Sequence, residues 1–166
     1  MRSRAALSIV LLAMTACTYR PTPVVLHASP GDVISLAGTW EGTYQGRESE
    51  RNGTITFTIE AGRDTAFGDV LMEAGPLQQF IAADARTGEH RLHARAPEVL
   101  RITWVGLHRG YVEGALEPYI APDCQCTVKT VFSGYLDDDG DLIKGDFATT
   151  GPSVRQTGTW TVIRKR

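Results

Sequence analysis

The sequence predicts an all-β fold, a single antiparallel up-and-down β-barrel of about eight to ten strands. Two observations lead to this prediction. Apolar and polar residues alternate along most of the chain, and short connections rich in turn-forming residues separate the alternating runs. Successive side chains of a strand point to opposite faces, so a period of two indicates antiparallel strands with one dry face and one wet face.

The alternation is clearest in three segments. A first strand is expected at residues 36–46 and a second at residues 53–60, each with its large apolar residues on one face and polar residues, threonine above all, on the other. A later strand is expected to carry Leu100, Ile102 and Trp104 on its apolar face. Strands of this kind can close into a barrel, which leaves no sheet edge free to aggregate.

Glycine recurs on the apolar face of the later strands. Because glycine weakens an ordinary strand, the repetition needs a cause. Glycines let strands bend sharply and let an aromatic ring lie against the backbone, as barrel closure demands. They also leave room for a ligand, and the two causes are compatible. The pattern occurs in four segments: Val112-x-Gly114-x-Leu116, Phe132-x-Gly134-x-Leu136, Ile143-x-Gly145-x-Phe147 and Gly158-x-Trp160-x-Val162.

Two connections stand out. Residues 137–141, four aspartates and a glycine, predict a tight hairpin turn, because Asp-Gly is a strong hairpin signal. Carboxylates at alternate positions also suit calcium, but their spacing is not that of an EF-hand loop and a turn explains them fully. Residues 82–97 are the one stretch in which a short helix or a long loop is expected.

The N-terminus has the three parts of a secretory signal peptide: Arg2 and Arg4, an apolar run, and small residues before Cys17. An apolar run of about ten residues is half of what a membrane span needs, so the segment is expected to be removed. Residues 12–17, Leu-Ala-Met-Thr-Ala-Cys, resemble the lipobox of bacterial lipoproteins. The resemblance implies that Cys17 receives a diacylglycerol and becomes the mature N-terminus. An ordinary signal peptide followed by a chance cysteine is the alternative.

The expected domain organisation is a lipoprotein signal peptide at residues 1–16, a lipidated N-terminus with a flexible tether at 17–35, and a barrel domain at 36–166. Prolines favour extended backbone in the tether, although an extra strand at residues 24–26 stays open. By resemblance to the sorting pattern of Gram-negative lipoproteins, Thr18 after the cysteine implies the cell envelope, on the periplasmic face of the outer membrane.

Cys124 and Cys126 would lie in an oxidising compartment, where disulfides persist. On a regular strand the two side chains share a face, but their separation is near the limit for bridging. The neighbouring Pro122 and Asp123 allow a bend that would bring the sulfurs together. A local disulfide and two small apolar thiols at the head of a strand both remain open.

The two ends of the barrel domain resemble the calycins, the lipocalin-like and avidin-like barrels. Gly38 and Trp40 match the Gly-x-Trp of the first calycin strand, and Arg164 lies near the end of the last strand. In lipocalins an arginine at this place packs across the tryptophan. The resemblance therefore implies that Arg164 stacks on Trp40, where first and last strands meet, and that its guanidinium bonds loop carbonyls. A solvated C-terminal arginine is the alternative.

Composition and motifs argue against several functions. The chain has 17 basic and 19 acidic residues; without Arg2 and Arg4 the count is 15 against 19, a net charge of −4. No basic stripe exists, so nucleic acid is not an expected partner. No nucleophile elbow, phosphate-binding loop or paired-carboxylate motif occurs, so we expect no catalytic residue and no enzyme. His90-x-x-His93 lacks a third ligand, so neither a metal nor a cofactor is expected.

The leading functional interpretation is a membrane-anchored lipoprotein whose barrel binds a small apolar or amphipathic ligand. An eight-stranded barrel, however, is only just wide enough for its own side chains to fill it. The alternative is a non-catalytic structural or interaction lipoprotein of the cell envelope with a filled core. Neither the ligand, a protein partner nor the oligomeric state follows from the sequence. The expected lining residues are Trp40, Tyr44, Phe57, Trp104, Phe132 and Phe147.

Overall fold

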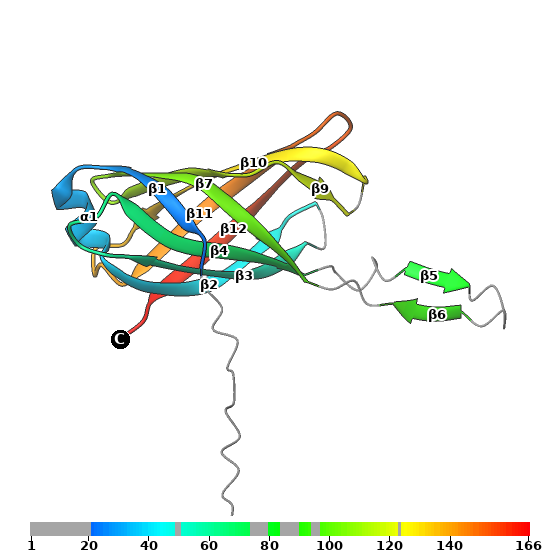
Figure 1. Ribbon diagram of the computed structural model, residues 1–166, viewed down its shortest axis with the longest axis horizontal. Helices are drawn as coiled ribbons and strands as arrows, with labels where there is room; N and C mark the ends of the chain where they lie inside the picture. Colours follow the sequence, from blue (N-terminus) through cyan, green and yellow to red (C-terminus); the bar gives the residue numbers. More distant parts are fainter. Residues whose placement is uncertain (1–20, 49–50, 74–79, 84–89, 94–96, 123) are drawn as a thin grey trace, which may run out of the picture.

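A computed structural model describes residues 21–48, 51–73, 80–83, 90–93, 97–122 and 124–166. Strands make up most of these residues, with one short helix (Figure 1). The elements are β1 Pro23–Ala28, α1 Pro30–Leu36, β2 Gly38–Gly46, β3 Asn52–Ile59, β4 Thr65–Glu73, β5 Phe80–Ala83, β6 His90–His93, β7 Glu98–His108, β8 Tyr111–Leu116, β9 Tyr119–Ala121, β10 Cys126–Leu136, β11 Leu142–Thr150 and β12 Arg155–Arg164.

Nine strands close into a barrel, so the predicted all-β barrel fold is confirmed. Eight of them, β2, β3, β4, β7, β8, β10, β11 and β12, follow one another in up-and-down order, and β12 returns to pair with β2. The ninth, β1, enters between β4 and β7. It runs antiparallel to β4 but parallel to β7, so the sheet is mixed, and the prediction of a purely antiparallel sheet is wrong.

Strand β1 fills an opening between two strands that diverge. At one end of the barrel β4 pairs directly with β7, through residues 69–72 and 98–101. Toward the other end the two strands separate, and β1 occupies the gap with Val24 and Leu26 facing the core, 2% and 6% exposed. Burial of these two side chains is the physical reason why this segment joins the fold.

The predicted tether at residues 17–35 is therefore wrong for its second half. Residues 23–36 form β1 and α1 and contribute to the core, and the extra strand left open at residues 24–26 is present. Just before β1, the backbone N–H and hydroxyl of Thr22 donate to the carboxylate of Asp69, at 3.3 and 2.9 Å. The predicted signal peptide and Cys17 lie outside the described residues.

Three further strands among the described residues do not belong to the closed ring. Strand β9 pairs only with the start of β10. Strands β5 and β6 form a separate two-stranded hairpin, drawn at the right of Figure 1, where a short helix or long loop was expected at residues 82–97. That expectation is wrong for residues 82–83 and 90–93, because local helix propensity in an alanine-rich segment is a weak prior that strand pairing overrides. Residues 84–89 and 94–96 lie outside the described residues.

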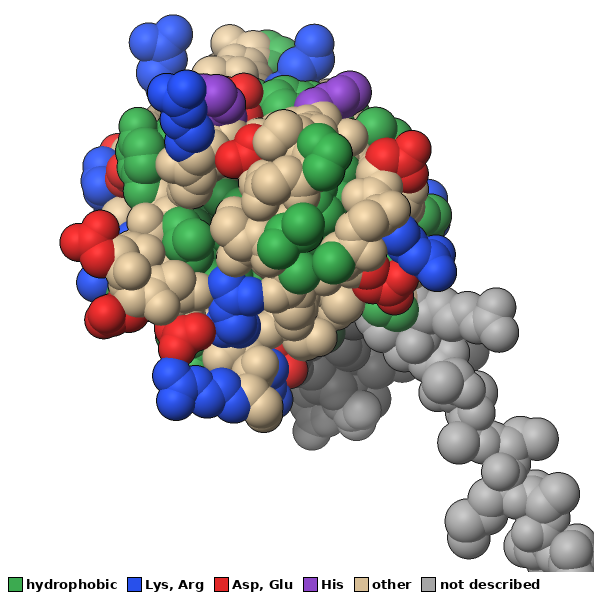
Figure 2. Space-filling view, turned by 90° about the vertical axis from the view of Figure 1, so that its left-hand side faces the viewer, with side chains coloured by type: hydrophobic (Ala, Val, Ile, Leu, Met, Phe, Trp, Pro, Cys, Tyr) green, Lys and Arg blue, Asp and Glu red, His purple; other side chains and the backbone are tan. Residues whose placement is uncertain are grey.

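Helix α1 covers one end of the barrel. Its N-terminus is capped by Ser29, whose hydroxyl accepts from the N–H of Asp32, and its apolar side is formed by Val33 and Leu36, 5% and 0% exposed. The indole N–H of Trp40 donates to the carbonyl of Leu36 at 2.9 Å, which joins the helix to β2. Figure 2 looks onto this closed end, where acidic and basic side chains are interspersed with apolar ones.

Arg164 stacks on Trp40 where the first and last strands of the ring meet. The two residues are register partners in the β12–β2 ladder, and the guanidinium carbon lies 4.5 Å from the centre of the indole. The guanidinium donates to the carbonyls of Ser35, Ala37 and Gly140. Gly38, at φ +136°, leaves the space in which the arginine side chain lies. These contacts are the ones that the sequence predicts.

The recurring glycines provide space for aromatic rings. A Cβ on Gly114 would lie 2.3 Å from an atom of the Phe132 ring, and a Cβ on Gly158 would lie 2.2 Å from the Phe147 ring. Trp160 lies in the same way against the glycines of β10 and β11. The rings therefore occupy the volume that the missing side chains vacate, as closure of a tightly curved barrel requires.

Replacing Arg164 by alanine should destabilise the barrel. The change removes a cation–π contact worth about 0.5–2 kcal/mol and leaves three carbonyls without a charged donor, at roughly 1 kcal/mol each. We expect the melting temperature to fall by roughly 8 °C or more. Lys165→Ala is the matched control, since Lys165 makes only an exposed ion pair with Glu41 at 2.8 Å, worth under about 1 kcal/mol. Equal melting temperatures for the two variants would contradict the closure role of Arg164.

Asp32 ties α1 to the β7–β8 turn and makes stability depend on pH. Hydrogen bonds from the Ser29 hydroxyl, at 2.6 Å, and from the N–H of Arg109, at 2.7 Å, hold the pKa of this carboxyl below its ordinary value. Because the folded pKa is the lower one, the stabilisation is complete above the pKa of the unfolded chain and is lost as the pH falls through the folded value. Asp32→Asn should therefore lower the melting temperature at pH 7, and the difference should shrink below about pH 4.

The control for this measurement is Asp138→Asn, an exposed aspartate in the β10–β11 turn. Its melting temperature should stay near that of the parent protein across the same pH range. If the melting temperature of Asp32→Asn lies below that of the parent protein by the same amount from neutral to acid pH, the charge of the Asp32 carboxylate does not stabilise the fold.

Candidate functional site

The barrel encloses a cavity of about 90 Å³. Side chains from every strand of the ring line it, and the part of the lining that lies toward α1 is aliphatic. This part includes Val24, Leu26, Leu36, Leu107, Val112 and Ile143. Such a surface can bind only apolar atoms without a loss of hydrogen bonds.

Four of the six predicted lining residues face the cavity: Tyr44, Phe57, Phe132 and Phe147. Tyr44 and Phe147 pack edge to face with ring centres 5.8 Å apart, and Phe132 packs in the same way on Trp160 at 6.0 Å. Offset and edge-to-face contacts of this kind fix the rings relative to one another. The aromatic part of the lining is therefore a packed cluster with defined geometry.

Trp40 points inward, as predicted, but it lies beneath the cavity and does not line it. Its side chain is fully buried between Arg164 and the ring of Phe57, which stacks on it with centres 6.0 Å apart. The prediction that Trp40 touches a ligand is corrected for this reason. Trp40 supports the ring of Phe57, which does line the cavity.

The prediction that Trp104 lines the cavity is wrong. Strand β7 has an irregularity between Ile102 and Trp104, where its register with β8 shifts by one residue. Leu100 and Ile102 line the cavity before this bulge, and Val105 and Leu107 line it after. A bulge inserts one residue into a strand and so reverses which side chains point inward. Trp104 consequently lies on the outer wall, where its ring packs against that of His27 with ring centres 6.1 Å apart.

A buried polar cluster forms the other part of the cavity lining. Arg51 is 3% exposed and donates to the hydroxyl of Tyr119 at 3.3 Å. The Tyr119 hydroxyl lies 3.3 Å from that of Thr130, which lies 2.7 Å from that of Thr149. These residues lie where β9 pairs with β10, at the end opposite α1 (Figure 1). The cavity thus has one aliphatic end and one end that carries hydrogen-bonding groups.

Sequence reasoning missed this polar cluster, although a signal for it exists. Residues 53, 55, 57 and 59 face inward on β3, so the same period of two extended backward places Arg51 on the inward face. Thr130 and Thr149 lie two residues from Phe132 and Phe147 in the same way. A charged residue at an inward position was the available clue.

The connection before β10 contains a disulfide between Cys124 and Cys126. The two Cα atoms are 5.1 Å apart. Gln125 between them adopts a positive φ of 49°, which supplies the bend that a regular strand lacks. The disulfide interpretation is therefore the one that the structure supports, and the bridge fixes the loop that leads into β10.

Two of the four aspartates of the β10–β11 turn, Asp137 and Asp141, have partners within the fold. The carboxylate of Asp137 accepts from the N–H groups of Asp141 and Leu142, both at 3.1 Å. A hydrogen bond from Arg166 holds the pKa of Asp141 below its ordinary value. These contacts account for the acidic turn as a structural element.

Within the described ranges, no cluster of three or more His, Cys, Asp or Glu residues could hold a metal ion. The side chains of His90 and His93 are not among those described. In the same part of the chain, no helix has the length and apolar character to cross a membrane. Comparisons with protein-family models, curated proteins and solved structures found no significant match to this chain.

Proposed function

We propose that the barrel binds one small amphipathic molecule in its interior, with the apolar part toward α1 and the polar end at Arg51 and Tyr119. The observation that carries the proposal is the two-ended cavity: aliphatic and aromatic side chains form most of the lining, and the polar cluster lies at one end. A site with a largely apolar wall and a few convergent polar groups is the usual form of a small-molecule site.

The cavity size restricts the ligand to a slender molecule. Sites for drug-sized ligands have volumes of about 300–1,000 Å³, whereas an apolar cavity of about 150 Å³ holds one benzene ring. The present volume of about 90 Å³ suits the end of a single alkyl chain. A longer chain requires movement of lining aromatics such as Phe132 or Phe147, so a single acyl chain is the class of ligand we propose.

The polar end supplies donors for a carboxylate or hydroxyl. Arg51 carries a permanent charge and offers five N–H groups in a planar fork, a geometry that suits a carboxylate. The hydroxyl groups of Tyr119 and Thr130 lie beside it. Together with the aliphatic end, they favour a fatty acid or a related amphiphile over a hydrocarbon.

We further propose that this barrel is a calycin-like domain carried by a lipoprotein of the cell envelope. The support is the lipobox-like segment ending at Cys17 and the stacking of Arg164 on Trp40 at the point of closure. A lipid anchor would hold the barrel beside a membrane, where acyl chains are abundant. Each buried methylene of the anchor adds about 0.8 kcal/mol to membrane binding.

Filling the cavity should weaken binding. Val70 lines the cavity and is 9% exposed, so Val70→Phe should project a ring into it and weaken decanoic acid binding at least tenfold, about 1.4 kcal/mol. Trp160 also lines the cavity, so saturable changes in tryptophan fluorescence report binding to the parent protein.

The matched control is Val131→Phe, the same change at a residue of β10 that is 55% exposed on the outer wall. It should bind decanoic acid like the parent protein. Overpacking costs about 1–3 kcal/mol, so the melting temperature of each variant is measured first, and Val105→Phe replaces Val70→Phe if the latter does not fold. Equal binding by inner and outer variants, or no saturable binding by the parent protein to acids of different chain length, would refute the proposal.

The role of Arg51 is tested by comparing an acid with an alcohol of equal length. Charged hydrogen bonds contribute about 1.5–3 kcal/mol, so Arg51→Met should weaken decanoic acid binding roughly tenfold or more. Decanol binding should change far less, because an alcohol forms no charged pair. If both ligands lose affinity equally, Arg51 acts through the fold and not through the head group.

A filled barrel that acts through its surface is the second candidate, and the small size of the cavity favours it. In that case a protein of the envelope would bind the loops or outer wall, and the interior would serve stability alone. Affinity purification from native envelopes, with the Val70→Phe variant as bait, separates the two functions. Partners that bind this variant and the parent protein equally would support the surface function.

A further inference from the structure

We propose that the outer wall of the barrel carries a second binding site, for an alkylammonium group. The site is a groove over Gly106, on the opposite face of the wall from the cavity. Besides Leu107, which also lines the inner cavity, the residues that form this Gly106 groove are His27, Trp104, Gly106, His108, Tyr111 and Glu113.

Strand register explains why the groove is there. His27 of β1, Gly106 of β7 and Glu113 of β8 are neighbours in one row across the wall. The central residue of the row has no side chain, so the neighbouring side chains of Trp104 and Glu113 can lie close above it. A Cβ on Gly106 would lie 3.3 Å from Cζ3 of Trp104 and 3.2 Å from Cγ of Glu113. The indole of Trp104 and the side chain of Glu113 thus lie close together above Gly106.

Aromatic rings form the walls of the groove. Trp104 is half-buried, and its ring packs edge-on against His27 with centres 6.1 Å apart. Tyr111 lies on the other side and is supported by Tyr135 of β10, with centres 4.9 Å apart and an angle of 51° between the planes. Each ring of the groove therefore packs against a second aromatic ring.

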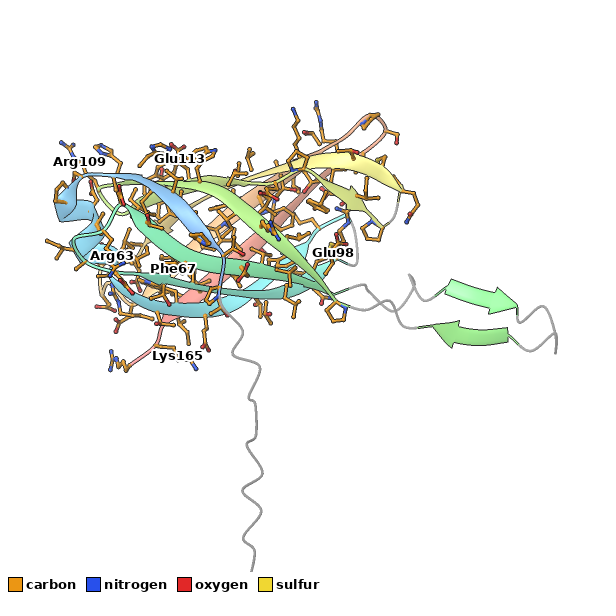
Figure 3. All side chains as sticks on the ribbon, in the orientation of Figure 1. Arg63, Phe67, Glu98, Arg109, Glu113 and Lys165 are labelled. Carbon is orange, nitrogen blue, oxygen red and sulfur yellow. A yellow bond between two sulfur atoms is a disulfide. The ribbon has the colours of Figure 1, made fainter. Side chains whose placement is uncertain are left out.

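Glu113 gives the groove its charge. It is exposed on the outside of the wall (Figure 3) and makes no hydrogen bond or ion pair with any residue that the structure describes. It is the only Asp, Glu, Lys or Arg among the residues that line the groove. A carboxylate attracts cations and repels anions, so the electrostatics select a positively charged ligand.

Aromatic faces beside a carboxylate suit an alkylammonium ion in particular. The quadrupole of tryptophan and tyrosine attracts a cation near the ring, and quaternary ammonium groups are the best-known ligands of such sites. An alkylammonium also presents apolar carbon to the rings, unlike a hydrated metal ion. Choline-type head groups and lysine side chains share this chemistry.

The test is a titration of the folded protein with choline and with its uncharged carbon isostere, 3,3-dimethylbutan-1-ol, followed by tryptophan fluorescence. Choline should give a saturable change with a dissociation constant on the order of millimolar, and the isostere should not. The change should be absent from Trp104→Phe, because the other tryptophans, Trp40 and Trp160, are buried in the barrel. Glu113→Gln should weaken choline binding by about two- to fivefold.

Glu117→Gln is the matched control, since Glu117 is an exposed glutamate just after β8 and outside the groove. It should bind choline like the parent protein. Phosphocholine and Nα-acetyl-lysine methyl ester then distinguish the two sources, and tighter binding of either one supports the site and identifies its class. Equal binding of the isostere, undiminished binding by Glu113→Gln, or no saturation by any of the amines overturns the proposal.

Discussion

The closure of the barrel through β2 and β12 is the constraint on which the other features depend. Seven consecutive pairs, from Gly158 with Gly46 to Arg164 with Trp40, join these strands. At the last pair the indole is fixed on one side by the guanidinium of Arg164 and is hydrogen-bonded to the end of α1. A single tryptophan thus connects ring closure to the helix that covers one end. Without this connection the sheet would have two free edges and the interior would be open to water.

The curvature of the strands limits the empty volume inside the barrel. Strong curvature requires small residues on the inward face, and large aromatic rings then lie against those positions, as Phe132 does on Gly114. Each ring restores packing density, which in protein interiors approaches that of organic crystals. The volume that remains is small and follows the gaps between rings. For this reason the interior has room for a thin chain and not for a broad molecule.

The sequence predicted the features that depend on local periodicity and missed those that depend on long-range pairing. The period of two identified most strands of the ring and most of their inward faces, and the resemblance to calycins implied the meeting of Trp40 with Arg164. The sequence did not decide whether β1 forms, because Val24 and Leu26 give only two inward positions between prolines. The burial of β1 depends on the divergence of β4 and β7. The bulge in β7 was not predictable, because it is defined by register with β8 and not by any residue type.

The departures from an ideal barrel have a common physical origin. Strands β4 and β7 separate toward the helical end, β1 fills the gap, and the bulge of β7 lies between the stretch paired with β4 and the stretch paired with β1. The bulge turns Trp104 outward, which removes a large ring from the interior and leaves smaller side chains on the cavity wall. It also places that ring beside His27 of the inserted strand. The irregularity that keeps a large ring out of the cavity therefore also forms the outer groove, so a change that restored regular pairing in β7 would alter both.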